Sequence, residues 1–129
     1  FSKVVGVELL PGLCELARTA ASRLREIQNA DMLPDDYCSG GRSYSPVEVV
    51  QGDMLQVDWS HADVMYLSSI CFSDEIMMGL AERTRRLKSG TRIITLKHFP
   101  KYQDEFEIIS SGWYKMTWGR INVLILKKL

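Results

Sequence analysis

The chain has 129 residues, of which 46% are hydrophobic and 25% are charged, as in one ordinary globular domain. Its 16 basic and 16 acidic residues give a formal net charge of zero, so no global field attracts nucleic acid or an anionic membrane. Its three cysteines form no CxxC pair and no apolar run approaches the ~20 residues of a membrane span, so we expect no metal site, no membrane contact and an intracellular location, in cytoplasm or nucleus.

The first residues read as a strand followed by a helix. Residues 3–9 are apolar almost throughout, as in a parallel strand that is covered on both faces. Pro11 suits the first turn of a helix. The apolar positions that follow fall on one stripe of that helix, as in a helix that packs on a core: Leu13, Leu16, Ala17, Ala20, Leu24 and Ile27.

Residues 29–46 carry no usable period and contain several prolines and glycines, which predicts a flexible loop or insertion. The sequence on each side is too short for a domain of its own. We therefore expect residues 1–129 to form a single, partial domain. The chain opens with Phe1 rather than Met, so residues were removed upstream or the chain is a piece of a longer protein.

The middle of the chain continues the alternation of strands and helices. Residues 47–51, 63–68 and 92–96 are predicted strands. Ser73 is a suitable N-cap for the helix between the last two, which ends at Ser89-Gly90. The stripe expected to be buried in this helix comprises Ile76, Met77, Leu80, Ala81, Thr84 and Leu87.

The end of the chain predicts an antiparallel hairpin. Residues 113–118 and 121–127 are strands separated by Gly119-Arg120, a pair that suits a two-residue type II′ turn. Trp113 and Trp118 are expected to be core aromatics. The chain is therefore an α/β protein with a closing hairpin.

In such sheets, ligands bind at the carboxyl ends of the strands, where this sequence places polar groups. Glu8 could accept hydrogen bonds from ribose hydroxyls, or could be a solvated strand-end carboxylate. Asp53 could accept from an adenine amino group, or could be a turn aspartate bonded to its own backbone. Ser68 and Ser69 could line a reacting centre, or could simply close a strand.

Three other candidates have plainer interpretations. Cys71 has no evident basic partner and is expected to be a small core residue rather than a nucleophile. Met77 and Met78 are expected to pack in the helix. His98, just past a strand, could reach a substrate but is more typical of a loop.

The order of these elements resembles the class I S-adenosylmethionine-dependent methyltransferases. The closing hairpin separates it from nicotinamide dehydrogenases. A narrower similarity is to the non-SET histone-lysine methyltransferases, the disruptor-of-telomeric-silencing family. It rests on Val5-Gly6-Val7-Glu8, Gly52-Asp53-Met54-Leu55, Trp59, the run from Asp63 to Phe72, Glu75, Leu80, Leu87-Lys88-Ser89-Gly90, Arg92-Ile93-Ile94 and Lys97.

The resemblance implies a Rossmann-like sheet with helices on both faces and S-adenosyl-L-methionine as the cofactor. Glu8, with Leu9 beside it, would bind the ribose hydroxyls. Asp53 would bind the adenine amino group, with Met54 packing on the adenine. Ser68 would contact the cofactor at the position of an asparagine that lines the methyl-transfer channel, and Phe72 matches an aromatic near that channel; these two are the candidate catalytic residues.

Two departures from the family put histone-lysine specificity in question. Ser68 replaces the asparagine, and residues 121–127 contain no tyrosine, which the family places beside the target lysine. The family's first strand and glycine-rich loop would lie upstream of Phe1. We therefore expect a sheet without its central strand, weak binding of the cofactor by this chain alone, and edges that could pair between copies.

The leading hypothesis is thus an S-adenosylmethionine-dependent methyltransferase whose acceptor is a protein side chain, with histone lysine as one candidate, or a small molecule. Two alternatives stay open. One is a fragment of a NAD-dependent oxidoreductase, since Glu8 suits either cofactor. The other is a catalytically inactive methyltransferase-like module that binds partners through residues 29–46 and its sheet edges.

Overall fold

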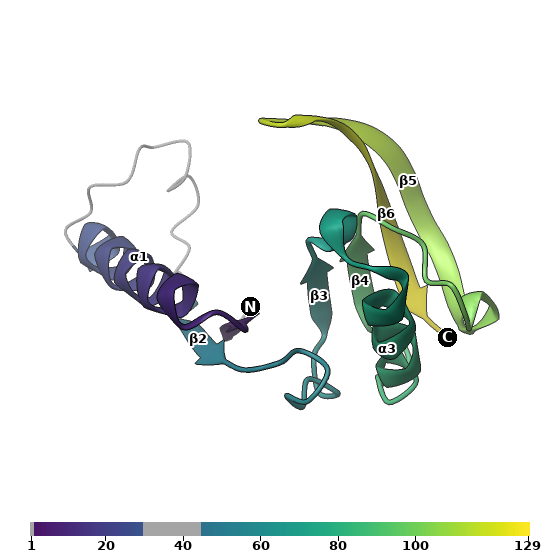
Figure 1. Cartoon of the computed structure of the whole chain (residues 1–129), viewed down its shortest axis with the longest axis horizontal. Coiled ribbons are helices and arrows are strands. Elements are labelled where there is room, and N and C mark those ends of the chain that lie inside the picture. Colours follow the sequence, from purple (N-terminus) through teal and green to yellow (C-terminus); the bar gives the residue numbers. More distant parts are fainter. Residues whose placement is uncertain (1, 30–44) are drawn as a thin grey trace. The chain divides into compact units, whose positions relative to one another are not determined.

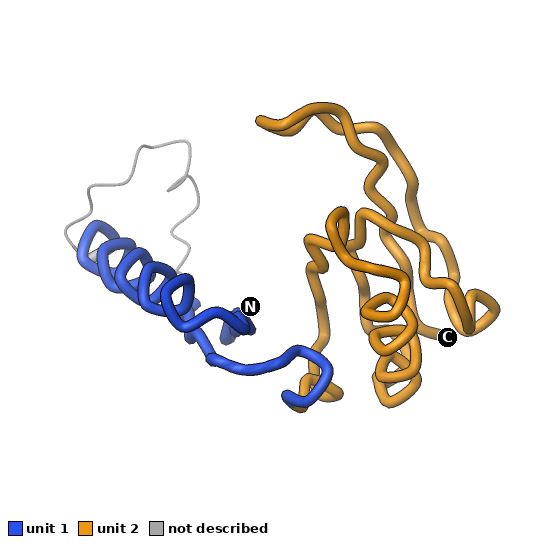
Figure 2. Tube along the Cα trace, in the orientation of Figure 1, with its two compact units in different colours: residues 1–57 blue, residues 58–129 orange. Residues whose placement is uncertain are grey.

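A computed structural model describes residues 2–29 and 45–129 of the chain. It divides into two compact units, residues 1–57 and residues 58–129, which are described one at a time (Figure 2). The loop predicted over residues 29–46 lies almost wholly outside the described residues. Its flexibility, and the extent of the domain, stay predictions.

The first unit is a strand–helix–strand unit. Its elements are β1 (Val4–Glu8), α1 (Pro11–Asn29) and β2 (Val47–Gln51). The two strands are parallel, paired from Val4↔Val47 to Glu8↔Gln51. The helix is anchored to β2 by Arg18, whose guanidinium donates two hydrogen bonds, of 3.3 and 3.1 Å, to the carbonyl oxygen of Val49.

The face of α1 that the sequence predicted to be buried is exposed in the structure, so that prediction is wrong. Leu13 and Leu16 are 48% and 66% exposed. Of the predicted stripe, Ala17 alone is half-buried, and the other small side chains with little exposure, Cys14 and Ala21, lie on the adjoining face. Small side chains let the helix approach β2 closely, and this turns the leucines away from the strands. The predicted cover on both faces of β1 is also absent from the described residues, because Val4 and Val5 are more than 40% exposed.

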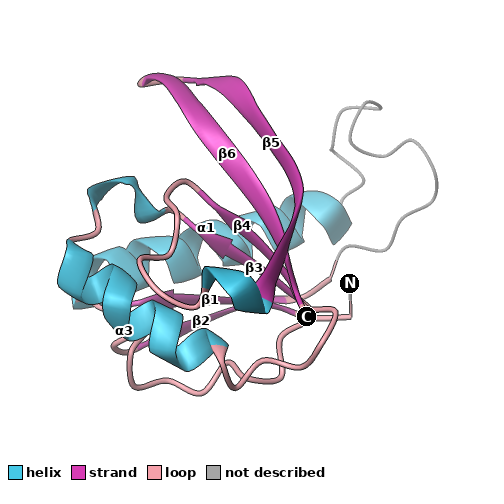
Figure 3. Ribbon diagram, turned by 90° about the vertical axis from the view of Figure 1, so that its right-hand side faces the viewer, coloured by secondary structure: helices cyan, strands magenta, loops and turns pink. Residues whose placement is uncertain are grey.

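The second unit holds the remaining elements (Figure 1). They are β3 (Val64–Leu67), a 3₁₀ turn η1 (Ser69–Cys71), α3 (Asp74–Thr84), β4 (Arg92–Thr95), a 3₁₀ turn η2 (Gln103–Glu105), β5 (Phe106–Met116) and β6 (Gly119–Lys128). The sheet order is β3-β4-β6-β5, with β3 parallel to β4 and β6 antiparallel to both of its neighbours (Figure 3). This order confirms an α/β fold that closes with an antiparallel hairpin.

The core of the second unit includes the buried face of α3. Met77, Leu80 and Ala81 are at most 2% exposed, as is Ile93 of β4. The helix begins where the sequence predicted, because the Ser73 hydroxyl accepts a hydrogen bond from the Ile76 amide at 3.4 Å. The packing role expected of Met77 is thereby confirmed.

The hairpin differs from its prediction in two ways. The turn residues are Thr117 and Trp118, and Gly119 pairs with Met116 as the first residue of β6. Gly119 has a φ of +143°, so the glycine is required directly after the turn and not within it. Trp113 and Trp118 are 68% and 62% exposed, so their assignment to the core is wrong.

The described strands form two sheets, β1-β2 and β3-β4-β6-β5. β1 and β3, which the resemblance predicts to be separated by another strand of one sheet, belong to different sheets here. Among the described residues, each of the two is paired along one edge only. None of the described helices is both long and apolar enough to cross a membrane.

Candidate functional site

Glu8 and Asp53 lie at the carboxyl ends of two neighbouring parallel strands. Glu8 is the last residue of β1 and pairs with Gln51, the last residue of β2. The amide of Gly52 donates to the carbonyl oxygen of Glu8 at 2.9 Å, which holds the two strand ends together. The first unit therefore brings both predicted adenosine-binding carboxylates to one edge, the edge where ligands bind in folds of this class.

The Glu8 carboxylate is half-buried and held by its own chain. Its Oε1 accepts a hydrogen bond from the Leu10 amide at 2.9 Å, and the Cys14 thiol donates to the Glu8 carbonyl oxygen at 3.2 Å. Its Oε2 receives no hydrogen bond from the described residues. One oxygen thus fixes the orientation while the other can accept from a ligand. Leu9, beside it, is 61% exposed.

Asp53 is arranged in the same way. Its Oδ1 accepts from the Leu55 amide at 2.8 Å, which is the turn arrangement foreseen as the plain alternative. A Cβ on Gly52 would lie 2.8 Å from Cγ2 of Val57, so close approach explains the glycine here. Met54 is half-buried within this turn. The turn and the ligand-binding role are compatible, because Oδ2 accepts nothing from the described residues.

In the second unit, the candidate catalytic residues flank η1. Ser68 is exposed at the end of β3, and its hydroxyl makes no hydrogen bond with the described residues. Phe72 is half-buried, and its carbonyl oxygen accepts a hydrogen bond of 2.6 Å from Nζ of Lys97. The segment between Ser68 and Phe72 is therefore held by a side chain that follows β4, the neighbouring strand.

A buried hydroxyl pair that the sequence did not single out strengthens this connection. The Ser69 hydroxyl, with no exposed surface, lies 3.0 Å from the Thr95 hydroxyl and accepts from the Leu96 amide at 3.1 Å. The one feature of the sequence that could have indicated these contacts is the pair of polar residues Thr95 and Lys97 at the end of an apolar strand. Their spacing of two positions places both side chains on one side of the strand but does not show which residues they contact.

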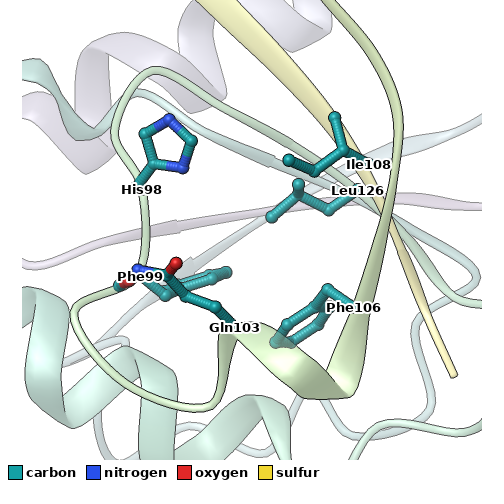
Figure 4. A pocket seen from close by; sticks show the side chains of 6 residues that line it. All are labelled: His98, Phe99, Gln103, Phe106, Ile108 and Leu126. Carbon is teal, nitrogen blue, oxygen red and sulfur yellow. Dashed lines mark hydrogen bonds between the residues drawn. The ribbon is translucent and has the colours of Figure 1, made fainter.

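Two predictions about single residues have different outcomes. Cys71 is exposed, so its assignment to the core is wrong, whereas Cys14 is fully buried. His98 lies in a loop, as expected, beside a small open hollow. Figure 4 shows the side chains around that hollow: His98, Phe99, Gln103, Phe106, Ile108 and Leu126. Most of these side chains are apolar, and the hollow is too small to be a candidate ligand pocket.

The carboxyl groups of the second unit whose pKa values are lowered lie on its surface. The hydroxyl of Tyr102 donates to Glu82 at 2.6 Å and holds the pKa of that carboxyl below its usual value. The Lys88 ammonium does the same to the pKa of Asp63. These groups join surface loops to α3 and β3 and do not surround Ser68.

No protein-family model matches the sequence, and no curated protein matches it. Solved structures do. An RNA methyltransferase from Salinibacter ruber, in complex with S-adenosyl-L-homocysteine, superposes on 98% of this chain with a TM-score of 0.62 and 22% identity. A protein from Haemophilus influenzae that is named as a methylase superposes on 99% of the chain with a TM-score of 0.58 and 17% identity.

These likenesses establish the fold. The chain adopts the α/β fold of the class I methyltransferases, as the sequence predicted. It spans 65% of the length of the Salinibacter protein and 73% of the length of the Haemophilus protein.

Proposed function

We propose that this chain is part of an S-adenosylmethionine-dependent methyltransferase in which Glu8 and Asp53 bind the adenosine half of the cofactor. The observation that carries the proposal is the placement of the two carboxylates at adjacent carboxyl strand ends, each with one oxygen held by a backbone amide. The fold supports it, because a protein of the same fold has been crystallised with S-adenosyl-L-homocysteine.

The donor set fits an adenosine. Vicinal ribose hydroxyls and the adenine amino group are donors, and both carboxylates offer an oxygen that accepts nothing from the described residues. Met54 would pack on the adenine and Leu9 beside the ribose. The bound cofactor supplies a methyl group on a positively charged sulfur. Ser68 and Phe72 would line the transfer channel and orient the attacking atom there, so this part of the catalysis is proximity.

Two classes of methyl acceptor follow from different observations. The resemblance over roughly residues 4–11 and 52–99 favours a protein lysine, including a histone lysine, but Ser68 departs from that pattern. The name of the Salinibacter neighbour favours RNA. A small-molecule acceptor has no specific observation in its favour. We place the enzyme inside the cell, in the cytoplasm or nucleus, in accord with the free thiols of Cys14 and Cys71.

The two alternatives to a methyltransferase make different predictions about binding. The antiparallel β6 within the sheet argues against a nicotinamide-binding fragment, whose sheet is mostly parallel. An inactive interaction module would not need the oxygens at Glu8 and Asp53. Pairing of sheet edges between copies is compatible with either a methyltransferase or an interaction module.

The test is an NMR titration of the isotope-labelled chain with S-adenosyl-L-homocysteine, which detects even millimolar affinity. We expect shifts concentrated in the amides of residues 8–10 and 52–55. Glu8→Gln and Asp53→Ala should each weaken binding by about tenfold, as expected when one charged hydrogen bond is lost. Glu48→Gln is the matched control, because Glu48 is an exposed carboxylate of the same unit that pairs with Lys3.

The result of the titration distinguishes the methyltransferase from its alternatives. Equal shifts with NAD at equal concentration would favour the oxidoreductase. No shift at millimolar S-adenosyl-L-homocysteine would contradict binding by this chain. If Glu48→Gln weakened binding as much as Glu8→Gln, the assignment of the ribose site to Glu8 would be wrong.

A further inference from the structure

The distal half of the β5–β6 hairpin extends past the rest of its sheet. β6 pairs with β4 only from Leu124 to Lys127, and Leu124 lies opposite Thr95, the last residue of β4. Because the two strands are antiparallel, residues 119–123 continue beyond the carboxyl end of β4. That is the end at which β3 leads to Ser68, since β3 and β4 are parallel. Figures 1 and 3 both show the hairpin running on past β3 and β4.

This extension combines exposed aromatic side chains with positive charge. Trp113, Tyr114 and Trp118 are 68%, 52% and 62% exposed. The only charged residues between positions 108 and 126 are Lys115 and Arg120. Although the net charge of the chain is zero, the region between positions 108 and 126 therefore has two cations and no acidic residue.

One face of the extension is defined by the pairing register. Lys115 lies directly opposite Arg120, and Trp113 lies directly opposite Asn122. Side chains at paired positions and at alternate positions of a strand share a face, so these four residues form one surface, which we call the arm face. Tyr114 is on the other side, where its ring lies 3.4 Å from where a Cβ of Gly112 would be.

The arm face pairs two positive charges across the hairpin. Like charges directly opposite one another on a sheet repel, and no ion pair joins Lys115 or Arg120 to an acid in the part of the chain that the structure describes. A polyanion that lies across the hairpin would remove this repulsion. Beside the two cations, the exposed indole of Trp113 offers a flat surface for a planar group.

We propose that the arm face binds single-stranded RNA. Cations that follow a phosphate backbone, combined with aromatic rings on which bases stack, are the chemistry by which proteins hold single strands. The Ser111 hydroxyl donates a hydrogen bond of 3.1 Å to Oδ1 of Asn122, beside Trp113. These two polar side chains could donate to, or accept from, a ribose 2′-hydroxyl. An acidic peptide would use the cations but has no base to stack on the indole.

The arm projects at the strand end that carries Ser68, so the bound strand would be the methyl acceptor. That last step rests on the proposed function, whereas RNA binding by the arm does not. Binding can therefore be measured without the cofactor. If the unmodified chain bound RNA but did not bind S-adenosyl-L-homocysteine, the proposed function would be overturned and the arm assignment would stand.

The experiment is fluorescence anisotropy of a labelled twelve-residue oligouridine with the chain. Trp113→Ala should raise the Kd about tenfold, and Trp113→Tyr should restore most of the affinity, because a ring that stacks is retained. Lys115→Ala with Arg120→Ala should lower the slope of log K against log salt concentration by about 1.4, since two phosphate contacts are lost. Lys101→Ala, an exposed cation of the same unit, should change neither quantity.

Three results would overturn the proposal. The first is a Kd for Trp113→Ala equal to that of the unmodified chain while circular dichroism shows both folded. The second is equal affinity for oligothymidine, which would assign the arm to single-stranded DNA. The third is equal competition by an oligoglutamate peptide, which would assign the arm to an acidic protein segment.

Discussion

The hydroxyl groups of Ser69 and Thr95 lie 3.0 Å apart and join the carboxyl ends of β3 and β4. The direction of the hydrogen bond follows from the other partners. Thr95 donates its single proton to the carbonyl oxygen of Lys97 at 3.0 Å, so Ser69 must donate to Thr95. Ser69 in turn accepts from the Leu96 amide. Every hydroxyl proton of the pair is thus used, and the start of the Ser69–Cys71 turn is fixed from within the sheet.

Removing either hydroxyl should therefore be costly. Ser69→Ala leaves the Leu96 amide without its partner in a buried place, and we expect a loss of about 1–3 kcal/mol in the free energy of unfolding. Thr95→Val, of similar volume, should cost a comparable amount. Urea unfolding followed by tryptophan fluorescence measures both, with Ser89→Ala as the exposed control. Additive losses in the double variant would contradict a direct bond between the two hydroxyls.

Lys97 is expected to position the candidate catalytic segment through the carbonyl oxygen of Phe72. Lys97→Met keeps most of the side-chain stem and removes the 2.6 Å hydrogen bond. We expect amide hydrogen exchange in residues 69–72 to speed up by about tenfold, which corresponds to about 1.4 kcal/mol of local opening. Lys101→Met is the matched control. Exchange that rises equally across β4 and α3 would show general destabilisation instead.

Much of the fold could be predicted from strand patterns. The β-branched run of β2 was predicted with the bounds that the structure has, Val47–Gln51, and β1, β3 and β4 lie within the predicted ranges. Short runs rich in Val and Ile, bounded by polar residues, are typical of strands, because β-branched side chains suit a pleated surface. The placement of Glu8 and Asp53 at one edge could be predicted for a related reason, because the carboxyl ends of parallel strands meet at one edge.

What could not be predicted depended on contacts between elements. The leucine stripe of α1 has a clear helical period, but the helix is held to the strands by Cys14 and Arg18, which lie outside that stripe. Ser69 and Thr95 are 26 positions apart, and no local pattern pairs their hydroxyls. Trp113 was predicted to be a core aromatic because large aromatic side chains are usually buried. The sequence does not show that the hairpin extends past β4, where nothing covers this side chain in the described part of the chain.

Stability should fall in mild acid partly through Glu82. Its carboxylate accepts from the Tyr102 hydroxyl first and is also near Arg85 and Lys101, so its pKa in the folded chain is below the ordinary value of 4.5. A depressed carboxyl pKa stabilises the fold above the unfolded value, and that contribution is lost as the pH falls through the folded value. Tyr102→Phe should therefore be less stable than the unmodified chain at pH 7 and nearly equal to it at pH 3. Urea midpoints at both pH values, with Tyr114→Phe as control, test this; a constant difference across pH would contradict it.

Gly119 should tolerate a side chain poorly. Its φ of +143° lies in a region that other residues rarely enter, although nothing within 4 Å would meet a Cβ there. We expect Gly119→Ala to destabilise the second unit by about 1–3 kcal/mol through backbone strain alone. Gly12→Ala is the control: it also meets nothing within 4 Å, but it lies in the first turn of α1, where alanine favours the helix by up to about 1 kcal/mol. Thermal unfolding of both variants should give shifts of opposite sign. Equal stability of Gly119→Ala and the unmodified chain would mean that the turn over Thr117 and Trp118 can close with an ordinary φ at position 119, and that β6 does not need a glycine to begin.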